Sequence, residues 1–180
     1  MQQQEVVIGK RSILTFTLWG ATGFGLGGAI GGAIWPSIGQ PYFGFVVMGA
    51  VGGASLGLAL KDWRRALISG AAGAIGFGVG SYLRNLMFNF LVGLLGVSLG
   101  LSFSDWKNVG LLLFKVGLLV LAGIVGFTFA IFNTWNLSSG EALWSALMLC
   151  IWGIIGGGLQ GLALGYLEKR KGRRESGQTG

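Results

Sequence analysis

The strongest constraint on the fold of this 180-residue chain is the length of its apolar segments. A helix needs about 20 apolar residues to cross the hydrocarbon core of a bilayer, with a range of about 17 to 25. Six segments meet this requirement, and charged or turn-forming residues separate them. They cover approximately residues 13–35, 42–60, 66–83, 86–103, 112–132 and 143–166.

The composition supports the same interpretation. Charged residues make up only 11% of the chain and hydrophobic residues 52%, whereas a soluble domain carries about 25% charged residues. So little charge cannot cover a surface that faces water. We therefore expect an all-α polytopic integral membrane protein, with residues 1–180 as a single membrane domain in contact with lipid. Residues 1–9 and 172–180 are expected to be polar tails.

The basic residues predict the orientation of the chain. If the N-terminus is cytoplasmic, 12 of the 13 Lys and Arg residues lie on that side, and Arg84 alone lies on the other. Cytoplasmic loops are enriched in Lys and Arg. Both termini are thus expected in the cytoplasm, in a bacterial plasma membrane or an equivalent membrane. Lys115 falls at the cytoplasmic mouth of the fifth segment, where its long side chain is expected to reach the interface.

Glycine is spaced regularly in the second, fourth and sixth segments. Residues four apart share a helix face, and glycines there let a neighbouring backbone approach closely. The predicted packing glycines are Gly49, Gly53, Gly57, Gly96, Gly100, Gly153, Gly157 and Gly161. In this respect the chain resembles glycine-zipper membrane proteins in a general way. A pore-lining or hinge role is the alternative.

The odd-numbered segments share a second pattern, G-x-x-G-F-x-x-[GA], at residues 20–27, 73–80 and 123–130. Together the two patterns predict three tandem helical hairpins, over approximately residues 11–60, 64–103 and 112–167. Parallel repeats in a membrane are related by an axis along the membrane normal. We therefore predict a pseudo-three-fold bundle of six transmembrane helices.

An Asp-Trp junction follows two of the even segments. "SLGLALKDWRR" at 55–65 and "SLGLSFSDWKN" at 98–108 are identical at six of eleven positions. Asp62 and Asp105 are predicted to cap the next helix, and Trp63 and Trp106 to anchor it in the inner interface. A docking surface for a cytoplasmic partner is the alternative interpretation.

The chain contains little that could perform chemistry. It has no histidine and a single cysteine, and none of its six acids lies in the middle of an apolar segment. We expect no enzyme activity, no cofactor and no metal site. The net charge of +7 is explained by topology, so no nucleic-acid partner is expected. Four polar residues inside the segments are candidates for lining a path: Asn89, Gln160, Ser55 and Ser98.

Two functional classes fit these observations. The first is a compact structural or accessory subunit, or an assembly factor, that packs against itself or a membrane partner. The second is a passive channel or permease for a small solute, with the hairpins around a path. A few polar residues are a thin lining for a path of about 30 Å, which favours the structural class.

The topology can be tested by cysteine-accessibility labelling. Cysteines introduced at positions 38, 84 and 138 are expected to react from the outer face, and those at 62, 105 and 172 from the cytoplasmic face, because the basic residues flank the second set. Labelling of positions 62 and 105 from opposite sides would contradict the repeat.

Overall fold

The structure is a computed structural model that describes residues 13–38, 42–82, 86–102, 109–134 and 142–177. These residues form six α-helices and no strand, which confirms the all-helical fold class. The helices are α1 (Ile13–Ile38), α2 (Tyr42–Ala59), α3 (Trp63–Tyr82), α4 (Leu86–Leu101), α5 (Val109–Thr134) and α6 (Ala142–Gly177).

The helices match the six apolar segments, with one large difference in length. The sixth segment was expected to end near residue 166, and residues 172–180 were expected to form a polar tail. Instead α6 continues to Gly177. The added residues are mainly Glu, Lys and Arg, which have high helix propensity and need no apolar surroundings to remain helical. Residues 172–177 of the expected polar tail therefore continue the helix.

Three stretches of helix are long and apolar enough to cross a membrane. They are Ile13–Ile38, Gly110–Ile131 and Leu143–Arg170. Two further helices, Phe43–Ala59 and Phe88–Leu101, are apolar but shorter. Helix α3 carries the charged pair Arg64 and Arg65 in its first turn. These helices suggest an integral membrane protein.

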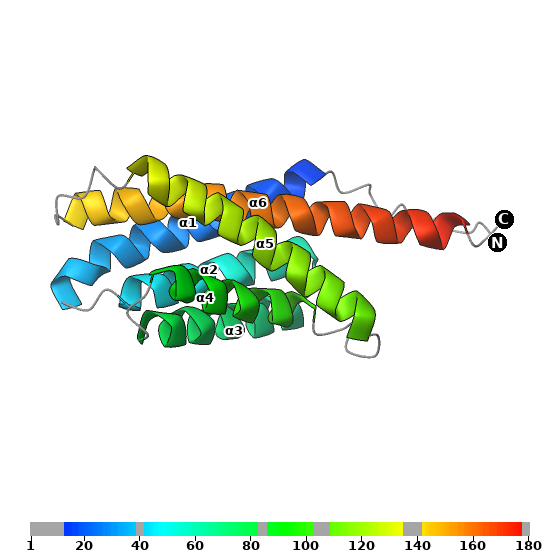
Figure 1. Cartoon of the computed structure of the whole chain (residues 1–180), viewed down its shortest axis with the longest axis horizontal. Helices are drawn as coiled ribbons and strands as arrows, with labels where there is room; N and C mark the ends of the chain where they lie inside the picture. The colour runs from blue at the N-terminus through cyan, green and yellow to red at the C-terminus, as the bar shows by residue number, and fades with distance from the viewer. Residues whose placement is uncertain (1–12, 39–41, 83–85, 103–108, 135–141, 178–180) are drawn as a thin grey trace, which may run out of the picture.

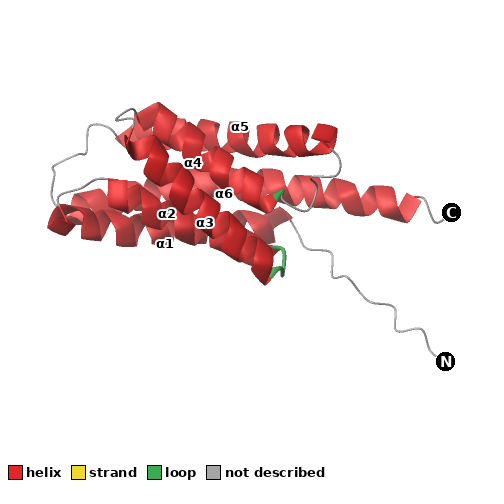
Figure 2. Cartoon of the chain, turned by 90° about the horizontal axis from the view of Figure 1, so that it is seen from below, coloured by secondary structure: helices red, strands yellow, loops and turns green. Residues whose placement is uncertain are grey.

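The helices alternate in direction and form a ring. Figures 1 and 2 show them running along the long axis of the molecule, with the start of α1 and the end of α6 at the same end. Each helix contacts its neighbours in sequence, and α6 closes the ring by packing along α1, which is the most extensive contact in the bundle. The contact between α4 and α5 is the smallest between consecutive helices.

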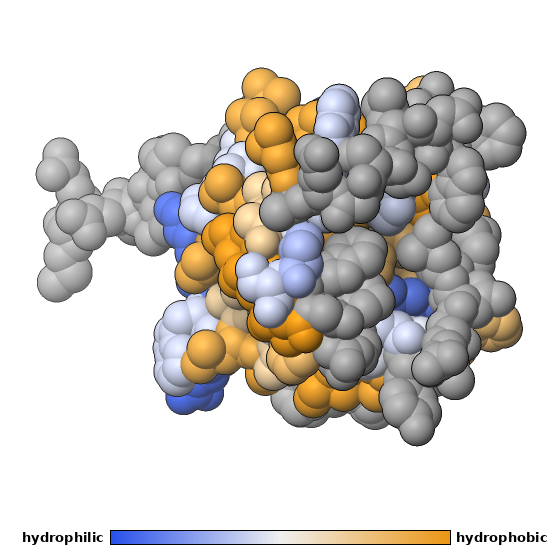
Figure 3. Space-filling model, turned by 90° about the vertical axis from the view of Figure 1, so that its left-hand side faces the viewer, coloured by the Kyte–Doolittle hydropathy of each residue, from blue (hydrophilic) through white to orange (hydrophobic). Residues whose placement is uncertain are grey.

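The outside of the ring is apolar. Leu67, Ile75 and Val79 lie along one face of α3 and are each more than half exposed. Leu113 and Leu121 on α5 are also more than half exposed. Figure 3, which views the bundle from the end on the left of Figure 1, shows orange apolar side chains on the surface of the described residues. A surface of this kind is matched to lipid rather than to water.

Glycines bring backbones into contact at several of the interfaces. Between α1 and α6, a Cβ built on Gly20 would meet the carbonyl group of Gly157, and one built on Gly157 would lie 2.5 Å from the carbonyl oxygen of Gly20. Between α2 and α3, a Cβ on Gly49 would lie 2.6 Å from the carbonyl oxygen of Gly73. Any side chain at these positions would have to push a backbone away.

The glycines of α4 face a different neighbour. In α2 and α6 the glycine face packs against the first helix of the next hairpin, α3 and α1 respectively. In α4, Gly96 and Gly100 pack instead against Ala72 and Ser69 of α3, the preceding helix. The α4–α5 interface is therefore left without backbone contacts of the α1–α6 kind. Among Gly117, Gly123 and Gly126 of α5, an added Cβ would meet α4 at Gly123, where it would meet the side chain of Leu94.

The glycine contacts lead to a stability prediction. Gly53→Leu and Gly157→Leu are expected to lower the free energy of unfolding by about 3 kcal/mol, because each side chain would enter space filled by another backbone. Gly117→Leu is the matched control, since a Cβ there meets nothing within 4 Å. Thermal unfolding in detergent measures all three. Equal stability of the three variants would remove the role assigned to the glycines.

Candidate functional site

The centre of the bundle is closed by three phenylalanines. Phe24, Phe77 and Phe127 come from α1, α3 and α5, and each is fully buried. Their ring centroids are 6.5 Å (Phe24–Phe77), 6.0 Å (Phe24–Phe127) and 6.5 Å (Phe77–Phe127) apart, with edge-to-face geometry. Such contacts are favourable because the positive edge of one ring meets the negative face of another. We call these three residues the aromatic layer.

Glycines on the even helices make room for the aromatic layer. A Cβ on Gly52 of α2 would collide with the ring of Phe24, and one on Gly156 of α6 would collide with the ring of Phe127. A Cβ on Gly93 of α4 would likewise collide with the ring of Phe77. Each ring therefore lies against the bare backbone of the partner helix in its own hairpin.

Further aromatic side chains extend the layer on one side. Phe90 of α4 stacks on Phe127 with a centroid distance of 4.4 Å and an interplanar angle of 27°. Trp152 of α6 and Phe45 of α2 contact Phe90 edge-to-face at 6.1 and 5.6 Å. These rings fill the interior with apolar groups.

Two of the predicted path-lining residues meet in the interior. The Gln160 side chain on α6 is fully buried, and its Nε2 donates a hydrogen bond to Ser98 Oγ on α4 at 3.3 Å. The Gln160 Oε1 atom accepts no hydrogen bond from the described residues. Because α4 and α6 are not neighbours in the ring, this bond crosses the inside of the bundle.

The other two path-lining candidates lie elsewhere. The Ser55 hydroxyl is 2.8 Å from the carbonyl oxygen of Gly52 and 3.0 Å from that of Trp19, so it belongs to the α1–α2 interface. Asn89 is buried in α4 beside Gly80 of α3, and its Oδ1 accepts no hydrogen bond from the described chain. The four candidates therefore do not form one continuous lining.

The first Asp-Trp junction is a tight turn between helices. Lys61 adopts a left-handed conformation with φ of 55° after the end of α2. The Asp62 carboxylate then accepts hydrogen bonds from the backbone N–H groups of Arg64 and Arg65, at 3.0 and 3.2 Å. This satisfies two otherwise free donors at the start of α3. Trp63 is 63% exposed, and the Arg64 guanidinium lies 5.8 Å from its ring centroid.

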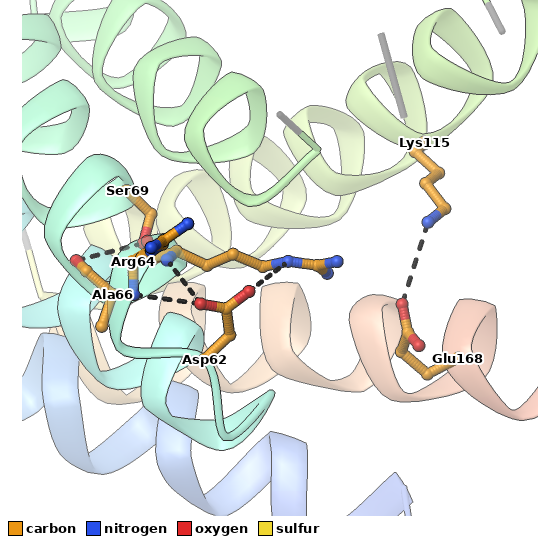
Figure 4. A network of polar contacts seen from close by, with 7 residues as sticks. Asp62, Arg64, Ala66, Ser69, Lys115 and Glu168 are labelled. Carbon is orange, nitrogen blue, oxygen red and sulfur yellow. Dashed lines mark hydrogen bonds and ion pairs between the residues drawn. The ribbon is translucent and has the colours of Figure 1, made fainter. Parts of the chain in front are cut away.

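The Asp62 carboxylate also forms an ion pair with Arg65, whose Nε lies 3.1 Å from Oδ2 (Figure 4). The pair lies beside the cap and involves half-buried side chains, so it fixes the turn rather than contributing much stability. The second junction cannot be compared, since Asp105 and Trp106 lie outside the described residues.

Lys115 is not placed as the sequence predicted. We expected its side chain to reach the interface, but it is 6% exposed and its Nζ lies 3.8 Å from Glu168 Oε1 on α6 (Figure 4). A buried ammonium group requires a partner of opposite charge. Glu168 supplies it because α5 lies against α6. The Lys115 ammonium group is therefore held in an ion pair between α5 and α6.

A small apolar cavity marks the weak contact between α4 and α5. Its volume is about 150 Å³. The residues that line it are Phe88, Phe90, Leu91, Ile124 and Thr128. The cavity lies where the ring lacks backbone contacts, and its lining is suited to apolar groups rather than to water.

Sequence reasoning assigned no role to the aromatic layer or to Glu168. A signal for the first was present, since phenylalanine is the only residue besides glycine that all three odd patterns share. The signal for the second was the opposite charge of Lys115 and Glu168 at the same predicted end of neighbouring helices. The position of a residue along its helix does not determine the direction in which its side chain points, so neither contact could be predicted from these signals alone.

Among the described residues, no group of three or more His, Cys, Asp or Glu side chains could hold a metal ion. Comparisons of the chain with protein-family models, with curated proteins and with solved structures found no match. The interior geometry is thus the basis for any functional conclusion.

Proposed function

We propose that the chain is a compact structural or accessory membrane protein, an accessory subunit or an assembly factor, that packs against itself or a membrane partner. In this proposal all six helices cross the bilayer as three hairpins around a pseudo-three-fold axis, with both termini in the cytoplasm. The single observation that supports it best is the aromatic layer.

Each hairpin contributes one ring of the layer, from the same position of its G-x-x-G-F pattern. The three centroid distances differ by only 0.5 Å, between 6.0 and 6.5 Å. Near-equal spacing of equivalent residues is expected if the hairpins surround a common axis. Rings on that axis block the route that a solute would have to take.

The competing proposal is a passive path for a small solute, and one observation favours it. Gln160 and Ser98 place polar groups inside the bundle, with the Gln160 Oε1 acceptor unused by the described chain. A path still needs polar groups on both sides of the layer. On the far side, the buried polar side chain that the described residues supply is Asn89, which lies beside Gly80 of α3.

Solute flux into proteoliposomes separates the two functions. Protein with the natural sequence is expected to transport small neutral and anionic solutes no faster than protein-free liposomes. Flux that is selective among solutes, and that is lost in Gln160→Leu while thermal stability stays normal, would overturn the structural proposal. Native mass spectrometry of the extracted protein is expected to detect bound subunits of the same chain or of a partner.

Phe127→Ala tests the layer itself. The substitution is expected to lower the free energy of unfolding by about 3–5 kcal/mol, since it removes a fully buried ring from a packed interior. Phe129→Ala is the matched control, because Phe129 lies on the same helix and is 60% exposed. If Phe127→Ala leaves stability unchanged but opens a flux, the layer acts as a gate rather than as packing.

A further inference from the structure

The buried polar side chains of the bundle differ in how their hydrogen bonds are made. In the first half of the chain, Ser69 lies 2.7 Å from the carbonyl oxygen of Gly53. Ser55 likewise bonds to two backbone carbonyl groups. Both serines serve the contact between two neighbouring helices, and the protein itself supplies their acceptors.

Gln160 is different, because the described chain satisfies only half of its side chain. Nε2 donates to Ser98, but Oε1 has no donor although the residue is fully buried. Leaving a buried acceptor without a partner destabilises the fold, because the acceptor loses its hydrogen bonds to water. Folded proteins commonly meet this need with an internal water molecule that bonds to polar groups.

Other buried polar groups continue from Gln160 toward one end of the bundle. Ser102 directly follows the end of α4, its backbone N–H donates to the Ser98 carbonyl oxygen at 3.1 Å, and it is 2% exposed. Lys115 and Glu168 come next, with Glu168 about 12 Å beyond Gln160 along α6 at a rise of 1.5 Å per residue. This is the end at which α6 extends past the bundle (Figure 1), and in the predicted topology it is cytoplasmic.

In the opposite direction along α6, residues 153–159 are all glycine, isoleucine or leucine. Gly157 lies one turn before Gln160 on α6, and a Cβ there would lie 2.6 Å from the ring of Phe24. Phe24 belongs to the aromatic layer. Gln160 is therefore the innermost group of a polar stripe, which we define as Gln160, Ser98, Ser102, Lys115 and Glu168. It lies one helical turn from Gly157, the glycine that adjoins Phe24.

We propose that the polar stripe is a hydrated inlet, open toward the cytoplasmic end and closed by the aromatic layer, in which Gln160 Oε1 binds a water molecule. The ligand must be a hydrogen-bond donor, since the unpaired atom, Gln160 Oε1, is an acceptor. The stripe also carries no net charge, because Lys115 is paired with Glu168. A small neutral donor is thus favoured over an ion. This inference rests on the proposed membrane location and topology.

The test is water-edited solid-state NMR of the full chain in liposomes. Transfer of magnetisation from water to the Gln160 side-chain amide and to Ser98 Cβ is expected to be about three-fold faster or more than transfer to Ser55 Cβ, because only the first two contact the bound water. Ser55 is the matched control, since it occupies the same position as Ser98 in the repeated junction and is also buried.

Gln160→Leu provides the second measurement. It removes the acceptor and is expected to slow the transfer to Ser98 to the level of Ser55. If Ser98 and Ser55 are equally slow in the natural sequence, or if Gln160→Leu leaves Ser98 unchanged, the inlet does not exist. Either result leaves the structural proposal in place, whereas solute flux across the liposomes would remove the structural proposal and leave a hydrated inlet intact.

Discussion

The close approach of helix backbones at glycine is the interaction on which the rest of the structure depends. In a bilayer, lipid tails are as apolar as the side chains, so burial of apolar surface gives little drive for two helices to associate. Van der Waals contact must supply most of the attraction, and it falls off steeply with distance. The contacts of Gly20 with Gly157 and of Gly49 with Gly73 bring helices together at the shortest distance that backbones allow.

The same glycines determine what can occupy the interior. Gly52, Gly93 and Gly156 expose bare backbone to the rings of Phe24, Phe77 and Phe127. A larger residue at any of these positions would displace a ring from the centre. Large aromatic side chains and missing side chains are therefore complementary parts of one interior, and together they leave the middle of the bundle packed.

At the α4–α5 interface this complementarity is missing, and the two helices make a smaller contact. The glycine face of α4 packs against α3 and is not available to α5. When the G-x-x-G-F patterns are aligned, Leu119 and Val120 of α5 take the positions of Ser69 and Gly70 of α3, so α5 has larger side chains there. The small contact between α4 and α5 and the cavity beside Ile124 both follow from this arrangement. The same two helices carry Ser98 and Lys115, which belong to the polar stripe. The loosest part of the ring thus adjoins the polar stripe.

The sequence by itself determined the helices, since apolar length and the charged breaks between segments depend only on local composition. It also determined which helix faces lack side chains, because glycines four apart must share a face. Only the tertiary structure decided which neighbour each face meets, as the reversed packing of Gly96 and Gly100 demonstrates. It also decided that Lys115 pairs with Glu168, that Gln160 bonds to Ser98, and that three phenylalanines meet. These contacts join distant parts of the chain, and their geometry depends on the rotation of each helix about its axis, which periodicity within one segment does not determine.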